Sequence, residues 1–162
     1  MAGAELDIVK KVHELFKRKG LKLTVAESCT GGLIGHLLTS EPGATAFFDS
    51  SVVCYSKGSK EKLLGLGRSF LEKHGTVNEE TTRAMAGAVR KATGADVSLA
   101  VTGNMGPEPF EGHKPGLVYV AVSLGVETTS KGFMFEGTRG QVKQSAAEEA
   151  LHYLFEAVSV WK

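Results

Sequence analysis

The sequence contains few of the residues that define several common classes of protein. Only two of its 162 residues are cysteine, Cys29 and Cys54, and no CxxC motif is present. A disulfide scaffold and a structural zinc site are therefore not expected, and this cysteine usage is typical of a reducing cytoplasm. Glu108, Glu111 and His113 are close in sequence but match no familiar metal-ligand spacing, so no metal site is expected.

Charge of one sign and long apolar runs are also lacking. The formal net charge is +1, which gives no electrostatic support for binding nucleic acid. No apolar run approaches the roughly 18 residues that a membrane-spanning helix needs. The first residues, 1–7, lack the basic and then apolar order of a signal peptide. We therefore expect a cytoplasmic protein with neither nucleic-acid nor membrane partners.

The composition that remains is that of a globular domain. Hydrophobic residues make up 42% and charged residues 23% of the chain, and a chain of this length can enclose a core of its own. No linker, internal repeat or low-complexity segment divides the sequence. A single domain over residues 1–162 is expected.

Hydrophobic periodicity predicts helices that alternate with strands in the first part of the chain and a β-hairpin before the last helix. This order favours an α/β fold, a three-layer α/β/α sandwich with a mixed, mainly parallel sheet. Helices are expected over 6–16 with a stop at Gly20, 30–38, 59–64, 78–93 and 141–158, and strands over 21–26, 51–55, 97–101, 117–124 and 131–135.

Chemistry is expected at the carboxyl ends of the strands, where open α/β sheets bind ligands. Three loops lie there, at 27–32, 55–60 and 102–114. The first contains Ser28, a candidate nucleophile that needs a base to remove its proton. Lys57, Lys60 and Lys62 follow the second strand and Tyr55 ends it, and these residues could supply that base, provided that burial or neighbouring cations depress the pKa of a lysine.

Each of these residues also has a structural interpretation. Ser28 could cap the next helix, a position that serine favours. Cys29 is a rival nucleophile, but a cysteine beside a tight turn is more often a small buried hydrophobe. Spacing alone does not decide between these alternatives.

Several groups could bind an anion or an oxyanion. Thr30, Gly31 and Gly32 lie where a helix begins, and helix N-termini carry unpaired N–H groups. Thr102 and Gly103 end a buried strand, where a plain turn is the alternative interpretation. Arg139 precedes the last helix and could bind a phosphate, or it could be a solvated residue of the helix start.

Together these segments resemble one family, the CinA C-terminal domain family of nicotinamide mononucleotide amidohydrolases, also called deamidases. The resemblance extends over about residues 6–158. It is carried by Thr24-Val25-Ala26-Glu27-Ser28-Cys29-Thr30-Gly31-Gly32-Leu33-Ile34, Pro42-Gly43-Ala44-Thr45-Ala46-Phe47-Phe48, Val52-Val53-Cys54-Tyr55-Ser56 with Lys60 and Leu63-Leu64-Gly65, His74-Gly75-Thr76-Val77, Ala100-Val101-Thr102-Gly103 with Gly106-Pro107, and Lys114-Pro115-Gly116-Leu117-Val118-Tyr119.

This resemblance implies hydrolysis of the carboxamide of nicotinamide mononucleotide to nicotinic acid mononucleotide and ammonia, a step of pyridine-nucleotide recycling. It implies Ser28 as nucleophile, Lys60 as base and Tyr55 as an aid to proton transfer, without metal or organic cofactor. Residues expected to bind the nucleotide substrate are Thr30, Gly31, Gly32, Thr45, Thr102, Gly103 and Arg139. A stand-alone form, without the N-terminal molybdopterin-binding-like domain of longer members, and a homodimer or larger homo-oligomer are also implied.

One segment departs from the family pattern. After Gly103 the family usually has small or aliphatic residues and then a glycine run, whereas this chain has Asn104 and Met105 and lacks those glycines. Glu108 and Glu111 make the loop acidic, which would oppose a phosphate. Two alternatives to the amidohydrolase therefore stay open: a non-catalytic nucleotide-binding module, and a hydrolase of a different amide or ester.

Overall fold

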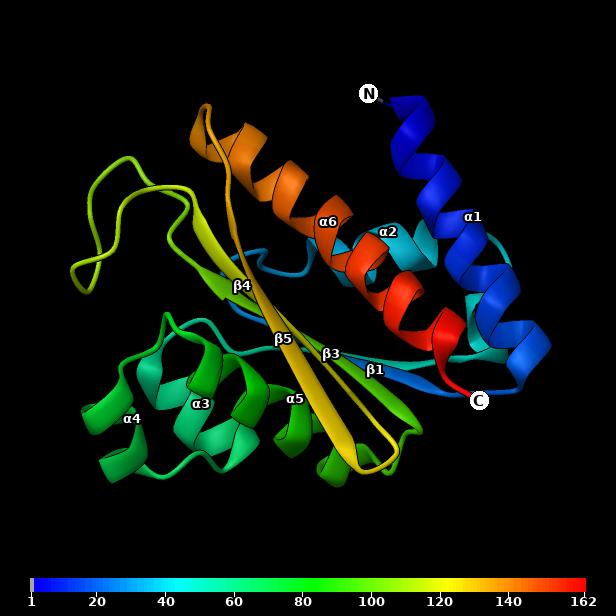
Figure 1. The fold of residues 1–162 in the computed structure, drawn as a ribbon, viewed down its shortest axis with the longest axis horizontal. Helices are drawn as coiled ribbons and strands as arrows, with labels where there is room; N and C mark the ends of the chain where they lie inside the picture. Colours follow the sequence, from blue (N-terminus) through cyan, green and yellow to red (C-terminus); the bar gives the residue numbers. More distant parts are fainter. Residues whose placement is uncertain (1) are drawn as a thin grey trace.

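A computed structural model describes residues 2–162, with side chains from Asp7 onward. One sheet of five strands is covered by helices on both faces (Figure 1). The strands are β1 (Leu23–Glu27), β2 (Phe48–Val53), β3 (Val97–Gly103), β4 (Leu117–Leu124) and β5 (Glu127–Met134). The helices are α1 (Ala2–Lys19), α2 (Leu33–Ser40), α3 (Lys57–Leu64), α4 (Arg68–His74), α5 (Glu79–Thr93) and α6 (Arg139–Val160), with a 3₁₀ turn η1 (Ala44–Ala46).

The sheet has the order β2-β1-β3-β4-β5. β1 pairs in parallel with β2 and β3, and β4 pairs antiparallel with β3 and β5. Four strands therefore point the same way and β4 alone is reversed. Helices α1, α2 and α6 lie on one face, and α3, α4 and α5 on the other (Figure 1). The expected three-layer α/β/α sandwich with a mixed sheet is confirmed.

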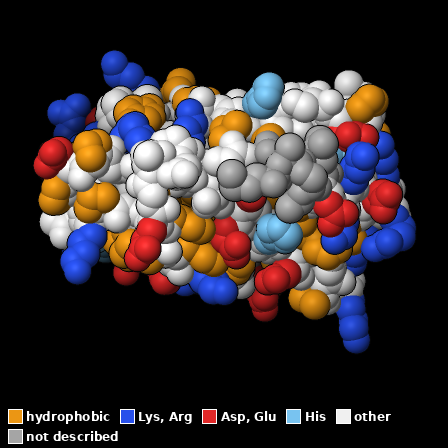
Figure 2. Space-filling model, turned by 90° about the horizontal axis from the view of Figure 1, so that it is seen from above, with side chains coloured by type: hydrophobic (Ala, Val, Ile, Leu, Met, Phe, Trp, Pro, Cys, Tyr) orange, Lys and Arg blue, Asp and Glu red, His pale blue; other side chains and the backbone are white. Residues whose placement is uncertain are grey.

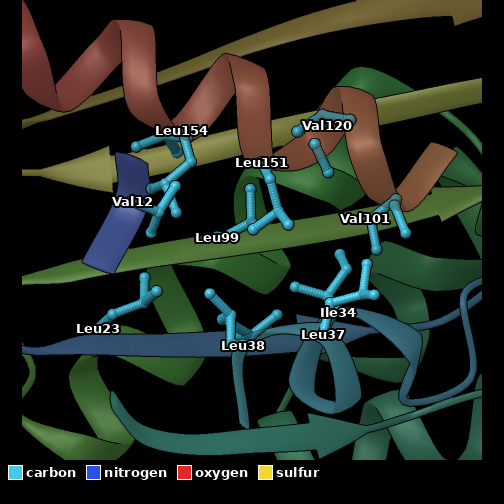
Figure 3. Packing of buried hydrophobic residues seen from close by; sticks show 14 of the residues in the cluster. Val12, Leu23, Ile34, Leu37, Leu38, Leu99, Val101, Val120, Leu151 and Leu154 are labelled. Atoms are coloured by element: carbon cyan, nitrogen blue, oxygen red, sulfur yellow. The ribbon is translucent and has the colours of Figure 1, made fainter. Parts of the chain in front are cut away.

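The alternation of side chains along the strands makes two cores of different character. The core under α1, α2 and α6 is filled by large aliphatic residues (Figure 3). On the opposite face, Ala26, Ala100 and Ala121 lie side by side in register across three strands. This stripe of small side chains lets α5 pack closely on the sheet, through Met85 and Val89.

Several element ends differ from the sequence-based expectation by a few residues; α1, for example, begins at Ala2 and α2 at Leu33. β2 begins three residues early, at Phe48, and α4 has no counterpart among the predicted helices. β5 begins at Glu127, because the turn at Gly125 closes the antiparallel ladder at once. This edge strand is rich in exposed polar residues, so its first half carries no hydrophobic signal.

The surface agrees with the near-neutral composition. Basic, acidic and apolar side chains are interspersed over the face seen in Figure 2. Among the helices that are described, none combines the length and the apolar composition that a membrane-spanning segment requires.

His13 is a buried histidine that joins two helices. It lies in α1, is 3% exposed, and its Nε2 lies 2.8 Å from the carbonyl oxygen of Leu38 in α2. Its ring packs edge-on against Phe47, and its Nδ1 has no hydrogen-bond partner among the described residues. Burial lowers the pKa of His13, with Lys17 acting in the same direction and the Leu38 carbonyl and Glu41 opposing it. The fold therefore favours the neutral ring.

We predict that the free energy of unfolding falls as the pH drops below about 6.5, the usual pKa of histidine. A lowered pKa in the native state means that the unfolded chain binds the proton more readily, so this contribution is complete above that pH and is lost below it. Urea unfolding of the wild type and of His13→Gln at about pH 7.5 and about pH 5.5 measures the effect. The variant should lose less stability than the wild type over this interval, and an equal loss in both proteins would contradict the assignment to His13.

Candidate active site

Ser28 lies directly after β1, at the carboxyl edge of the sheet. Its N–H donates to the carbonyl oxygen of Val101 in β3 at 3.0 Å, so Ser28 continues the strand pairing by one residue. The chain then turns sharply through Gly31 and Gly32, both with positive φ. This geometry fixes Ser28 on the rigid sheet and not on a mobile loop.

The carboxylate of Glu27 holds this turn together. Glu27 is completely buried and accepts five hydrogen bonds, which tie β1 to β2 and to the start of α2. Oε2 accepts from Thr30 Oγ1 (2.7 Å), Gly32 N (3.0 Å) and Ile34 N (3.1 Å), and Oε1 accepts from Gly35 N (2.8 Å) and Ser51 Oγ (2.7 Å). A charged acceptor at a helix N-terminus also stabilises the helix dipole.

This arrangement corrects the expected role of the glycine turn. The Gly32 N–H and the Thr30 hydroxyl donate to Glu27, and the Gly31 N–H donates to the carbonyl oxygen of Ser28. These donors are satisfied inside the protein and do not face a ligand. In the described part of the chain, the N–H groups of Cys29 and Thr30 are the neighbours of Ser28 that make no such hydrogen bond.

Lys60 reaches Ser28 from the opposite side. It is 1% exposed, and its Nζ lies 2.7 Å from Ser28 Oγ. The same Nζ lies 2.9 Å from the carbonyl oxygen of Cys54 and 3.1 Å from that of Tyr55. Lysines 57 and 62, the other two candidates, are exposed. The structure therefore brings together Ser28 and Lys60.

Local chain geometry explains why Lys60 points inward. The hydroxyl of Ser56 caps α3 by accepting from the Ser59 N–H, and the Lys60 N–H donates to the Ser56 carbonyl. Lys60 lies one turn into α3, so its side chain lies against the end of the sheet. The position of Lys60 is therefore set by the Ser56 cap and by the first turn of α3.

The environment of Lys60 suits a neutral amine. Burial lowers the pKa of Lys60, while Cys54, Cys29 and Glu111 oppose this effect. A neutral amine has two N–H donors and one lone pair, which match two carbonyl oxygens and one serine hydroxyl. In that state the Ser28 hydroxyl donates to Nζ, the contact that proton transfer requires.

The thiols of Cys29 and Cys54 do not compete with Ser28 for the role of candidate nucleophile. Burial raises the pKa of Cys29 to about 12, and it raises the pKa of Cys54 as well. A thiol that stays protonated is a weak nucleophile. Cys29 is therefore a packing neighbour of Ser28, in agreement with the structural interpretation of its sequence position.

Tyr55 lies at the rim of the site and not between Ser28 and Lys60. Its side chain is 59% exposed, and its hydroxyl accepts from Arg139 Nη2 at 2.9 Å. Arg139 Nη1 donates to the carbonyl oxygen of Gly106 at 2.5 Å. Thr138 forms a capping box that positions Arg139 in the first turn of α6. The structure thus pairs Tyr55 with Arg139, and the phenol makes no hydrogen bond to Ser28 within the described chain.

A cavity of about 600 Å³ opens in front of Ser28. Its walls include Tyr55, Thr102, Gly103 and Arg139, and its volume is within the range of small-molecule sites. Thr102 is buried and its hydroxyl donates to the Thr76 carbonyl oxygen. Gly103 is required for packing, because a Cβ there would lie 2.6 Å from the carbonyl oxygen of Leu117.

Thr45 is not part of this cavity, which corrects its expected role in substrate binding. It lies in η1, just before β2 begins at Phe48, whereas Ser28 and Cys54 follow the opposite ends of β1 and β2. Strands rise about 3.3 Å per residue, so the full length of the sheet separates Thr45 from Ser28 within one chain.

The loop between β3 and β4 closes the cavity, and Asn104 organises it. Asn104 Nδ2 donates to the carbonyl oxygens of Glu108 and His113, and its Oδ1 accepts from the Gly106 N–H. Asn104 therefore supplies three hydrogen bonds within the loop. This role has no local sequence signal, because its partners follow from the folded loop.

Possible metal ligands do not gather at the site. In the part of the chain that is described, no three His, Cys, Asp or Glu side chains come together as metal ligands would.

A serine hydroxyl in contact with a buried lysine amine, at the carboxyl edge of a mixed sheet, defines the protein as a three-layer α/β domain with a candidate Ser–Lys site. The family model described as "CinA C-terminal domain" matches residues 5–158. The chain therefore belongs to the CinA C-terminal domain family.

Relatives and solved structures agree with this assignment. A putative competence-damage inducible protein of Geobacillus kaustophilus is 39% identical over 92% of this chain and 36% of its own length. A CinA-like protein of Geobacter sulfurreducens is 40% identical over 95% of this chain and 38% of its own length. The chain thus spans little more than a third of these curated relatives.

Crystal structures of similar length match almost throughout. The competence damage-inducible protein A of Klebsiella pneumoniae has a TM-score of 0.94 and 31% identity, covering 98% of this chain and 99% of its own. A CinA superfamily protein of Enterobacter cloacae has a TM-score of 0.91 and 34% identity, covering 95% and 92%.

We predict that Glu27→Gln lowers the free energy of unfolding by about 3 kcal/mol, because an amide places N–H donors against backbone N–H groups in a buried site. Urea denaturation measures the change. Glu14→Gln, at an exposed position of α1, is the matched control and should change stability by less than about 0.5 kcal/mol. Similar values for the two variants would show that the Glu27 carboxylate does not hold the turn.

Proposed function

We propose that the protein hydrolyses the carboxamide of nicotinamide mononucleotide, giving nicotinic acid mononucleotide and ammonia. The observation that carries this proposal is the 2.7 Å contact between Lys60 Nζ and Ser28 Oγ in a buried environment. Membership of the CinA C-terminal domain family, which includes amidohydrolases, supports the choice of an amide as substrate.

In the proposed first step, neutral Lys60 takes the proton of Ser28 as Oγ attacks the carboxamide carbon. The lowered pKa of Lys60 makes the neutral amine accessible at lower pH than for an exposed lysine. The C–N bond then breaks, and the leaving nitrogen takes the proton from Lys60 and departs as ammonia. An ester of Ser28 remains.

In the second step, water attacks the ester and gives its proton to Lys60. The bond to Oγ breaks, and Lys60 returns the proton to Ser28. Negative charge develops on the carbonyl oxygen in both steps and needs N–H donors. We assign this role to the N–H group of Cys29, which lines the cavity beside Ser28, since the nearby Gly31 and Gly32 N–H groups are already used.

The anionic end of the substrate is assigned to Arg139. This side chain lines the cavity and is held by Gly106 and Tyr55, so its guanidinium is pre-oriented. Tyr55 would then orient Arg139 as well as shape the rim. A pre-oriented guanidinium loses less conformational entropy on binding phosphate.

Hydrolysis of a different amide is the second candidate. It is favoured by the loop held together by Asn104, whose residues form much of the cavity wall. The chemistry of Ser28 and Lys60 would be the same, and the loop would select another leaving group or another anionic arm. A function in binding alone would not explain the contact between Ser28 and Lys60.

We predict that Ser28→Ala and Lys60→Met each lower kcat for ammonia release from nicotinamide mononucleotide by at least about 10²–10⁴-fold, the usual contribution of such groups. Lys62→Met, an exposed lysine of the same helix, should retain wild-type activity. The wild-type rate should rise with pH and then level off, because the working form of Lys60 is neutral. The midpoint of the rise should lie below about 10.4, the ordinary pKa of lysine. Full turnover by Ser28→Ala would exclude the acyl-enzyme.

We also predict that Arg139→Gln raises KM for nicotinamide mononucleotide by about 10- to 100-fold, since a hydrogen-bonded charge contributes about 1.5–3 kcal/mol. The dephosphorylated nucleoside serves as the control substrate, and its kcat/KM should change little. Steady-state kinetics with both substrates measure the difference. An equal loss of kcat/KM for both substrates would show that Arg139 only supports the loop at Gly106 and does not bind the phosphate.

A further inference from the structure

The turn between α4 and α5 presents three hydrogen-bond donors to one carboxylate. Glu111 Oε2 accepts from Thr76 N at 2.7 Å and Val77 N at 3.2 Å, and Oε1 accepts from Thr76 Oγ1 at 2.9 Å. Successive backbone N–H groups that converge on an anion form the kind of concave site that binds phosphate and carboxylate groups. We call the donors of Thr76 and Val77 the anion cradle.

Gly75 provides the space for the oxygen in this cradle. A Cβ on Gly75 would lie 2.7 Å from Glu111 Oε2, closer than a side chain can approach. Gly75 also has a φ of 79°, which favours glycine. The position therefore leaves room for a ligand oxygen where a larger residue would fill the site.

The cradle belongs to the cavity of the candidate active site. Thr76, Val77 and Glu111 all line the cavity that also contains Ser28. Glu111 is among the groups that act on the pKa of Lys60, so a charge in the cradle acts on the proposed base. An anionic arm of a bound substrate in this cavity would lie within reach of these donors.

The position of Glu111 in the chain permits its carboxylate to leave the cradle and a ligand anion to replace it. It has a φ of 49°, the one left-handed non-glycine residue in the described chain, a conformation that carries strain. It lies at the tip of a turn closed by mutual hydrogen bonds of Phe110 and His113. The loop extends beyond the sheet (Figure 1), and residues 107–112 are exposed. Release of the carboxylate therefore leaves the core intact.

We infer that the cradle of Thr76 and Val77 is an anion subsite that Glu111 fills when no ligand is bound, and that a phosphate or carboxylate group of a ligand takes the place of the Glu111 carboxylate. This subsite is separate from Arg139. The tethered carboxylate competes with every ligand, so its removal increases the affinity of the cradle for free anions.

The test is a titration of ¹⁵N-labelled protein with inorganic phosphate, and in a parallel arm with acetate, at constant ionic strength. The amide resonances of Thr76 and Val77 are followed in the wild type, in Glu111→Ala and in Glu108→Ala. Glu108 is the matched control, since it also lines the cavity and removes the same charge, while its carboxylate makes no hydrogen bond in the described chain.

We expect saturable shifts of both amides in Glu111→Ala, with an affinity at least about tenfold higher than in the other two proteins. Adding Thr76→Val to Glu111→Ala should weaken binding again by loss of the hydroxyl. Equal affinities in Glu111→Ala and Glu108→Ala, or no shift of these amides in Glu111→Ala, would overturn the proposal. Because no turnover is needed, failure here is distinguishable from absence of amidase activity.

Discussion

The amino group of Lys60 is the constraint on which the site depends. A buried amine needs a hydrogen-bond partner for each of its donors and acceptors. The Lys60 amine contacts Ser28 Oγ and the carbonyl oxygens of Cys54 and Tyr55. An unpaired buried ammonium would be costly, so the end of β2 and the turn after β1 must be held at fixed distances. Burial lowers the pKa of Lys60, and the hydrogen bonds that accommodate its buried amine also determine where Ser28 lies.

Glu27 solves the complementary problem on the other side of Ser28. Its carboxylate gathers the free N–H groups at the start of α2 and links them to Ser51 of β2. The N–H groups at this helix N-terminus are therefore already hydrogen-bonded within the protein, and they stabilise the Glu27 carboxylate. A segment that resembles an anion-binding turn in sequence is, in the folded protein, a rigid mount for Ser28.

Much of the fold could be predicted from the sequence because long, periodic apolar segments dominate it. The polar edge strand β5 and the short helix α4 lack that signal, so they were missed in whole or in part. The pairing of Ser28 with Lys60 was an expectation from the resemblance, because spacing alone left three lysines open. The roles of Glu27, Asn104 and Glu111 depend on partners that only the tertiary structure brings near, and Thr45 was misplaced for the same reason.

The cavity therefore has two kinds of wall. Ser28 and Lys60 are held by strand ends and helix caps that belong to the core, so the chemistry they can perform is fixed by the fold. The opposite wall is a loop held by a few side chains, chiefly Asn104, Arg139 and Glu111. Loops tolerate substitution better than strand ends. Substitutions that change which ligand the cavity accepts should therefore arise on the loop side.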